Sequence, residues 1–399
     1  MNRGNASKWR DFKISAIKIQ NFKGIESLEL EIGKRFNVIV GENGSGKSTI
    51  IKAFLHLMSC LTRRISLPEM QFYQMNKICS LEVHFGDGLS WKISTDSDND
   101  ETSDLGSIRK EITHNNGKNS LPVVAYYGAS RFVSKHTSKV GKGKDSYSPR
   151  KMYSLSKSIF EGFKPLFAWI SDCYEEPSKR GQLEFVKEVG KSVLSKYDSI
   201  SNRISFLRKG YTFEFDELSE GEKCLFALVA DIARQLIIAN NGDENPLEGD
   251  GIIFIDEIDL HLHPNMQIDM VEKLERLFPN CQFIVTSNSP FVVSNLQTYK
   301  GDKLIHIEGS SIYSVPDNVY GEKVDNMLIE FFNAKTLRNN EMQKHIDKVW
   351  SALADGDYKL EHAENDMNWL NENLSSDDIE FVKIKFEQLK QKKDYEKNK

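Results

Sequence analysis

The sequence lacks any long apolar run, and this absence excludes a membrane-spanning helix. Mean hydropathy is −0.48, and no uninterrupted apolar stretch reaches the roughly 18 residues that a span requires. The first residues, MNRGNASKWRDFK, also lack the apolar core of a signal peptide. We therefore expect a soluble, cytoplasmic protein that makes no membrane contact.

Cysteine is scarce, and neither sign of charge dominates. The 399 residues include only 5 cysteines, and no two of them form a Cys-x-x-Cys pair. This odd, scattered set indicates neither a disulfide framework nor a zinc knuckle. The 53 Lys and Arg residues against 58 Asp and Glu residues give a net charge of −5. A uniformly basic, nucleic-acid-coating surface is thereby excluded, although a local basic patch is not.

The first motif is a glycine loop between an apolar strand and a helix. The run FNVIV at 36–40 predicts a buried strand, and IIKAFLHLMSCL at 50–61 has apolar residues at helical spacing. Between them lies the pattern G-x-x-x-x-G-K-[ST], whose backbone N–H groups curl around phosphate oxygens. We expect Lys47 to neutralise the phosphates of ATP and Ser48 to bind Mg²⁺. The predicted ATP-binding residues of this loop are Gly41, Asn43, Gly44, Ser45, Gly46, Lys47, Ser48 and Thr49.

A second motif follows another apolar strand. The apolar run at 252–255 is followed directly by Asp256 and Glu257. In nucleoside triphosphatases, this arrangement holds Mg²⁺ through the first acid and positions the attacking water through the second. Beside a phosphate-binding loop, the pair predicts an ATP hydrolase with Mg²⁺ bound by Ser48 and Asp256.

The segment LSEGEK at 218–223 precedes a long amphipathic helix. It predicts a helix start with Ser219 as N-cap and Glu222 as its capping-box partner. It also resembles the signature motif of ABC-type ATPases, particularly the heads of the SMC, Rad50 and RecF group. That resemblance implies that Ser219 and Gly221, with Glu222 beside them, contact the γ-phosphate held by a second subunit. A homodimer or a higher homo-oligomer is then expected.

The resemblance to these heads continues through DEIDLHLHP at 256–264 and TSNSP at 286–290. Related heads usually carry histidine where Asn288 stands. Asparagine can donate a hydrogen bond but cannot carry a proton as imidazole does, so slow turnover is expected. The resulting catalytic set is Lys47, Glu257 and Asn288. His261 and His263 have two interpretations, as metal ligands or as part of the packing of this loop.

A closer resemblance covers nearly the whole chain. It is to the ATPase subunits of Septu-type antiphage systems, the PtuA family, including relatives found with retrons. The motifs that carry it are Asn21 to Gly24, Ala125 to Gly128 with Arg131, Leu218 to Lys223, Asp231 to Arg234, and Tyr320-Gly321. The resemblance implies a small HNH nuclease of the PtuB kind as partner. A retron reverse transcriptase with RNA–DNA, or DNA itself, is a further implied partner.

Several of these outer motifs keep two interpretations. Asn21 and Lys23 could reach the nucleotide, as matching positions do in such heads, or lie on the surface. Tyr126 and Tyr127 are either core aromatics or a base-stacking or partner site. The basic stretch from Arg131 to Lys164 is either a solvated loop face or a phosphate-contacting patch.

The predicted fold class is α/β, an ABC-ATPase head with a mixed β-sheet flanked by helices. We divide the chain into an N-terminal lobe at 1–130, a basic loop and helical insertion at 131–210, a C-terminal lobe at 211–317, and a helical tail at 318–399 for oligomer or partner contacts. A hairpin is expected at 79–94, with its turn at Gly86 to Gly88.

The predicted function is that of a regulatory and scaffold ATPase in an antiphage defence complex, which controls an HNH nuclease through nucleotide-dependent oligomerisation. One alternative is a RecF-like repair ATPase that clamps DNA, and another is a nucleotide-binding scaffold with negligible turnover. Asp355-Gly356-Asp357 follows a predicted helix rather than a strand, unlike the carboxylates of a Toprim nuclease. We therefore do not expect the chain itself to be a nuclease.

Overall fold

A computed structural model describes residues 12–61, 77–95, 105–106, 122–129, 163–308, 311–313, 315, 318–334 and 336–397. The chain divides into two compact units, Met1–Met327 and Leu328–Lys399. The second begins later than the tail predicted from 318. Residues 131–162 of the basic stretch lie outside the described residues. None of the described helices combines the length and apolarity of a membrane span.

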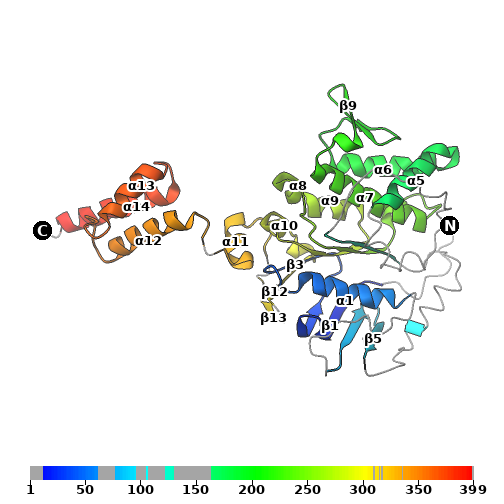
Figure 1. Cartoon of the computed structure of the whole chain (residues 1–399), viewed down its shortest axis with the longest axis horizontal. Helices are drawn as coiled ribbons and strands as arrows, with labels where there is room; N and C mark the ends of the chain where they lie inside the picture. Colours follow the sequence, from blue (N-terminus) through cyan, green and yellow to red (C-terminus); the bar gives the residue numbers. More distant parts are fainter. Residues whose placement is uncertain are drawn as a thin grey trace. The chain divides into compact units, whose positions relative to one another are not determined.

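The first unit is organised around a sheet of six described strands (Figure 1). Five neighbours run parallel, and the edge strand β13 is antiparallel to β12. Every residue of β3, β6, β10 and β11 is buried, as expected for parallel strands covered on both faces. Their carboxyl ends therefore meet at one edge. The strand order is β13 (Ser311–Tyr313), β12 (Lys303–Glu308), β3 (Phe36–Val40), β11 (Cys281–Thr286), β10 (Gly251–Ile255), β6 (Val123–Tyr127).

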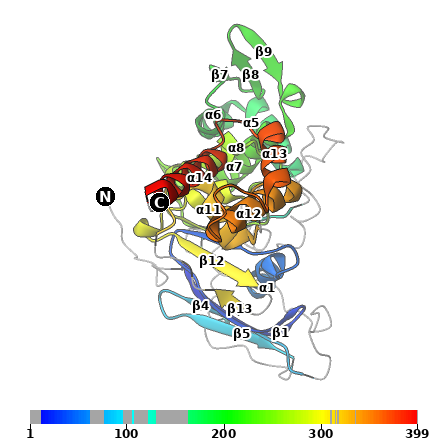
Figure 2. The same cartoon turned by 90° about the vertical axis from the view of Figure 1, so that its left-hand side faces the viewer.

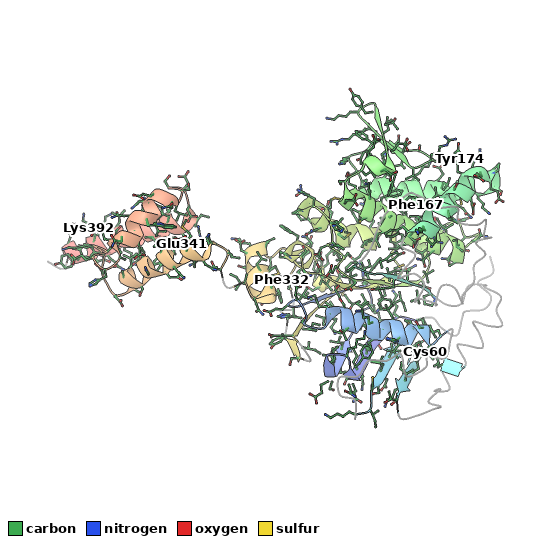
Figure 3. All side chains as sticks on the ribbon, viewed as in Figure 1. Cys60, Phe167, Tyr174, Phe332, Glu341 and Lys392 are labelled. Atoms are coloured by element: carbon green, nitrogen blue, oxygen red, sulfur yellow. The ribbon has the colours of Figure 1, made fainter. Side chains whose placement is uncertain are left out.

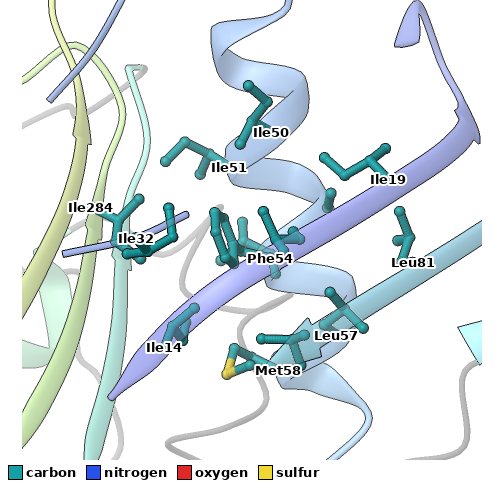
Figure 4. Close-up of a cluster of buried hydrophobic side chains, with 14 of the residues drawn as sticks. Ile14, Ile19, Ile32, Ile50, Ile51, Phe54, Leu57, Met58, Leu81 and Ile284 are labelled. Atoms are coloured by element: carbon teal, nitrogen blue, oxygen red, sulfur yellow. The ribbon is translucent and has the colours of Figure 1, made fainter. Parts of the chain in front are cut away.

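A second, antiparallel sheet covers the helix that follows β3. Its order is β2 (Ile25–Glu31), β1 (Ile14–Phe22), β4 (Ser80–Phe85), β5 (Ser90–Ser94), which confirms the predicted hairpin. Helix α1 (Lys47–Ser59) lies between the two sheets. In Figure 4 its Ile51 and Phe54 pack among Ile14 of β1 and Ile284 of β11. This apolar core fixes the helix start beside the end of β3.

Helices cover the opposite face of the larger sheet (Figure 1). They are α5 (Lys164–Glu175), α6 (Arg180–Val193), α7 (Glu220–Ala239), α8 (Pro264–Ile268), α9 (Met270–Leu277) and α10 (Pro290–Ser294). The α6–α7 contact is close, because a Cβ on Gly190 would lie 2.5 Å from the Phe226 ring. Phe167 of α5, labelled in Figure 3, meets Phe215 just before the signature segment at 5.0 Å between ring centroids.

The segment before the signature departs from expectation. The strand predicted from 211 is present as β9 (Tyr211–Glu214). The predicted helical insertion up to 210, however, also contains two strands, β7 (Ser199–Ile200) and β8 (Ser205–Arg208), and β9 joins them in a separate antiparallel meander. Figure 2 shows it extending from the helical layer, away from β1, β4 and β5. The meander is anchored by Phe206, which is fully buried against Phe226 and Tyr197.

The second unit is helical, as predicted for the tail. It contains α12 (Asn340–Ala354), α13 (Glu364–Asn373) and α14 (Ile379–Lys397), while α11 (Val324–Phe332) spans the division between the units. A small core holds the helices together and includes Ile346, Val349, Leu353, Leu370, Phe381 and Ile384. Asp355-Gly356-Asp357 follows α12 rather than a strand, in agreement with the sequence.

Candidate functional site

The loop between β3 and α1 depends on its glycines. Gly41 has φ +152°, and a Cβ there would lie 2.1 Å from the carbonyl oxygen of Ile307 in β12. Gly44 and Gly46 have φ of 84° and 103°, a region that L side chains rarely adopt. Gly46 is also the N-cap of α1. The glycines therefore allow the loop to curve, so that the N-terminus of α1 faces the inside of the loop.

Two side chains of this loop indicate an anion-binding site. Lys47 is 8% exposed, and its Nζ donates to the carbonyl oxygens of Gly41 (2.7 Å) and Glu42 (2.9 Å). Burial lowers the pKa of Lys47, against the opposing effect of nearby carboxylates. Ser45 Oγ is buried without a hydrogen-bond partner in the described part of the chain. A buried hydroxyl, a buried ammonium and a helix N-terminus together fit a phosphate group.

Asp256 follows β10 and meets the start of α1. Its Oδ1 accepts hydrogen bonds from Ser48 Oγ (3.0 Å) and from Thr286 Oγ1 (2.6 Å). Only 6% of the residue is exposed. A carboxylate beside a serine hydroxyl provides the hard oxygen donors that Mg²⁺ prefers, so these residues fit the cation. Two residues 208 positions apart in the sequence are thus brought together.

Glu257 has an unusual backbone. Its φ is +52°, and its N–H donates to Thr286 Oγ1 at 2.7 Å. Strained conformations of non-glycine residues concentrate at functional sites. Thr286 therefore holds both acids of the motif, one through its hydroxyl hydrogen and the other through its oxygen. Sequence reasoning placed Thr286 in a motif but gave it no role.

The loop after Glu257 is tied to the segment that carries Asn288. Asp259 Oδ1 accepts from Ser287 Oγ at 2.7 Å and from the Asn288 N–H at 3.2 Å. The Asn288 residue is itself exposed. Its backbone is thus fixed by the neighbouring loop, while its side chain faces outward.

Gln267 of α8 makes a second link between the same two segments. Its Nε2 donates to the carbonyl oxygen of Leu262 (2.7 Å), and its Oε1 accepts from Ser289 Oγ (2.6 Å). Ser289 in turn caps α10. Sequence reasoning placed Asp259 in a motif without a role and did not single out Gln267, because the partners that link them to the Asn288 segment lie more than 20 residues away.

The signature segment forms the predicted capping box. Ser219 Oγ donates to Glu222 Oε2 (2.8 Å), which also accepts from the Ser219 N–H (3.1 Å). The other Glu222 oxygen pairs with Lys196. Burial alone would raise the pKa of Glu222, but the hydrogen bonds from Lys196 and Ser219 hold it below its ordinary value. The hydrogen of the serine hydroxyl is therefore donated within this chain, and the oxygen accepts from the Glu222 N–H at 3.4 Å.

Gly221 has a structural requirement of its own. A Cβ at this position would lie 2.4 Å from the carbonyl oxygen of His261, whose φ is +64°. The loop after Glu257 therefore packs directly on the start of α7. His263 serves as N-cap of α8, with its Nδ1 accepting from the Asn265 N–H at 3.3 Å.

The outer motifs occupy mostly structural positions. Tyr126 and Tyr127 are buried, at 8% and 7% exposure, as the core interpretation predicts. Tyr127 OH donates to Asp231 Oδ2 of α7 at 2.9 Å, and the Tyr127 carbonyl oxygen accepts from the Asp256 N–H at 2.8 Å. The two motifs thus join α7 to the strand ends that carry the acids.

Asn21 lies near the end of β1 and Lys23 in the tight turn that follows it, and both have positive φ. Asn21 is buried, and its Nδ2 donates to the carbonyl oxygen of Lys77 at 2.6 Å. Lys23 is half-buried, and its Nζ lies 5.6 Å from the centroid of the Phe22 ring. Burial and the neighbouring Lys52 lower the pKa of Lys23. Asn21 is thus a buried strand residue bonded within this chain, and Lys23 stays a predicted nucleotide contact.

Comparison with known proteins gives the following relatives. The family described as RecF/RecN/SMC N terminal domain matches residues 13–308. The Retron Ec83 probable ATPase of Escherichia coli is 25% identical, over 94% of this chain and 86% of its own. The Retron Vc95 probable ATPase of Vibrio cholerae is 27% identical, over 73% of each chain. The Septu protein PtuA of Bacillus thuringiensis is 26% identical, over 70% of this chain and 72% of its own.

Proposed function

The chain belongs to the RecF/RecN/SMC N-terminal domain family, and from this premise we propose that it binds ATP with Mg²⁺ at residues 41–49 and hydrolyses it. The observation that carries the proposal is the Ser48–Asp256 contact at the end of a loop whose Ser45 hydroxyl is unpartnered among the described residues. Bound MgATP supplies a reactive phosphoanhydride and a cation that neutralises its charge. The loop N–H groups and Lys47 hold the phosphates, while Ser48 and Asp256 hold the cation.

Glu257 positions and polarises the attacking water in this proposal, and Thr286 keeps the Glu257 backbone in place. Asn288 donates a hydrogen bond at the switch position but takes no proton. Turnover is therefore slow. The change Asn288→His should raise the hydrolysis rate and introduce a pH dependence near about 6.5. An unchanged rate in a variant that still binds ATP would remove Asn288 from the catalytic set.

The cation site is tested by measuring ATP affinity calorimetrically with Mg²⁺ and with EDTA. The wild-type chain should bind ATP more tightly with Mg²⁺, and Ser48→Ala should lose most of that gain. Ser27→Ala, at an exposed position of β2, is the matched control and should behave as wild type. An undiminished Mg²⁺ gain in Ser48→Ala would contradict the assignment.

A second copy of the chain completes the site in this proposal. Ser219, the Gly221 backbone and the N-terminus of α7 form an additional anion site, which we assign to the γ-phosphate bound by the neighbour. Two copies then enclose two ATP molecules. Glu222 holds the serine in place until the neighbour arrives.

The biological role that we propose is regulation of an antiphage nuclease. The support is similarity to proteins named as retron ATPases and Septu PtuA, over up to 94% of this chain. The ATP state of the dimer or oligomer restrains or releases a small HNH nuclease, with a reverse transcriptase and RNA–DNA in retron-like settings.

The role is tested by affinity purification of the wild-type and Glu257→Gln chains expressed from the native locus, with bound protein and nucleic acid identified. A stoichiometric small nuclease supports the defence role. Its absence in both forms, together with ATP-dependent dimers that hold DNA, would instead favour a RecF-like clamp.

A further inference from the structure

Helix α14 has apolar residues on two opposite faces. On the first face, Phe381 and Ile384 are 1% and 0% exposed within the tail core. On the same side, Gln388 and Gln391 donate to the carbonyl oxygens of Tyr358 and Leu353, both at 3.0 Å. This face fixes α14 to the rest of the second unit.

The second face of α14 consists of exposed apolar side chains. Ile379, Val382, Phe386 and Leu389, here called the α14 stripe, are 74%, 49%, 69% and 57% exposed. Their spacing of three, four and three residues is that of a coiled-coil seam. At about 100° per residue they fall within about 80° of the helix circumference, narrower than the apolar side of a helix lying on a globular core.

Lysines border the α14 stripe on both sides. Lys383 and Lys390 lie along one side, and Lys385 and Lys392 along the other; Lys392 is labelled in Figure 3. Lys383, Lys390 and Lys392 are exposed. Lys390 reaches Glu387 at 3.4 Å, and the Lys385 Nζ lies 4.1 Å from the Phe381 ring centroid. These positions correspond to the e and g positions of a heptad, which select the partner.

The charge of the flanking lysines determines which kind of helix can bind the α14 stripe. If two copies of α14 paired, lysines would face lysines in either a parallel or an antiparallel arrangement, because all four flanking positions carry the same charge. A partner helix with carboxylates at its flanking positions would form ion pairs instead. We propose that the α14 stripe binds an amphipathic helix of a partner protein that carries Asp or Glu beside its apolar residues.

The shape of the stripe favours a helix over other ligands. Helices that lie on membranes present broad apolar faces, whereas this stripe is one or two residues wide and backed by a packed unit. A nucleic-acid site would place cations at its centre, where this surface has Phe386 and Leu389. The proposal gives the nuclease-regulating role a docking surface, but its evidence lies in the second unit alone and is independent of the ATP site.

The test uses the full-length chain without nucleotide and defined peptides as probes. Fluorescent helical peptides of four heptads carry Leu at a and d and either Glu, Gln or Lys at e and g. The wild-type chain should bind the Glu peptide at least about tenfold more tightly than the Lys peptide. The variant Phe386→Ser/Leu389→Ser should lose this binding. Ile329→Ser, which removes an exposed apolar side chain of α11, should keep it.

Charge reversal makes the test specific. Lys383→Glu/Lys390→Glu should weaken binding of the Glu peptide and gain binding of the Lys peptide. Lys344→Glu, an exposed position of α12, should change neither. Equal affinity for the three peptides would overturn the proposal. So would a Phe386-dependent homodimer in sedimentation, or stripe-dependent binding to phosphatidylglycerol vesicles or DNA in place of the peptide. ATP affinity, measured in parallel, reports separately on the proposed nucleotide site.

Discussion

The two halves of the proposed ATP site differ in how their polar groups are engaged. In the loop after β3, the Ser45 hydroxyl is unpartnered among the described residues and Lys47 donates only to backbone carbonyls. In the signature segment, the Ser219 hydroxyl donates to Glu222, which Lys196 also holds. The first half is therefore prepared for a phosphate within one chain. In the second half, the Ser219 hydroxyl must give up its hydrogen bond to Glu222 before it can donate to a phosphate bound by a neighbouring chain.

The largest effect is expected from the prepared half. Lys47→Ala removes a buried ammonium from the phosphate site and should weaken ATP binding at least about a hundredfold, or about 3 kcal/mol. Lys52→Ala, on the exposed side of the same helix, should change affinity little. Calorimetric titration of both variants checks this, and nearly equal affinities would contradict the role of Lys47.

Glu257→Gln separates binding from turnover. The amide keeps the shape of the side chain but cannot accept the proton of the attacking water, so hydrolysis should fall about a hundredfold or more. ATP affinity should stay close to that of the wild type. Phosphate release and binding are measured side by side, with Glu272→Gln at an exposed position of α9 as control. Undiminished release from Glu257→Gln would show that another group handles the water.

In the signature segment, a negative charge at position 219 should weaken ATP-dependent self-association, whereas a change that keeps the N-cap uncharged should not. Both Ser219→Asn and Ser219→Asp keep a good N-cap, so both chains should fold and bind ATP singly. Only aspartate places a negative charge against the phosphate of the neighbour. ATP-dependent self-association, followed by sedimentation, should therefore be more than about tenfold weaker for Ser219→Asp than for Ser219→Asn. Equal association would place the signature away from the partner nucleotide.

The smallest effect concerns pH and the cap itself. Because the pKa of Glu222 is lowered in the folded chain, its ion pair adds stability above the unfolded pKa of about 4.3 and loses it as pH falls. Lys196→Met should cost less than about 1 kcal/mol at pH 7, since the lysine is 46% exposed. The difference from wild type should shrink toward pH 3 in urea unfolding. Lys191→Met, exposed on α6, serves as control. A difference that is constant with pH would exclude the ion pair as its source.

Local features were the ones that sequence predicted. The capping box of Ser219 and Glu222 involves residues three apart, and the strand, glycine loop and helix around 36–59 follow one another directly. The buried strands β10 and β11 were readable as apolar runs. The mixed α/β fold was therefore predictable from the sequence.

Other features required the folded chain. The strands β7 and β8 are only two and four residues long, so their sequences carry too short a pattern to predict them, whereas the strand at β9 was predicted. Gln267 and Asp259 act through partners distant in sequence. The requirement for glycine at 221 comes from the backbone of His261, which no sequence pattern reveals.

The central claim, that each site takes its loop from one chain and its signature from another, is tested by mixing two inactive variants. Lys47→Ala chains lack a working loop, and Ser219→Asp chains lack a working signature. In an equal mixture, each mixed dimer regains one intact site of two, so hydrolysis should rise clearly above that of either variant alone and stay at or below about half of the wild-type rate. No recovery, with mixed dimers shown to form and the Ser219→Asp chain still binding ATP, would contradict the account.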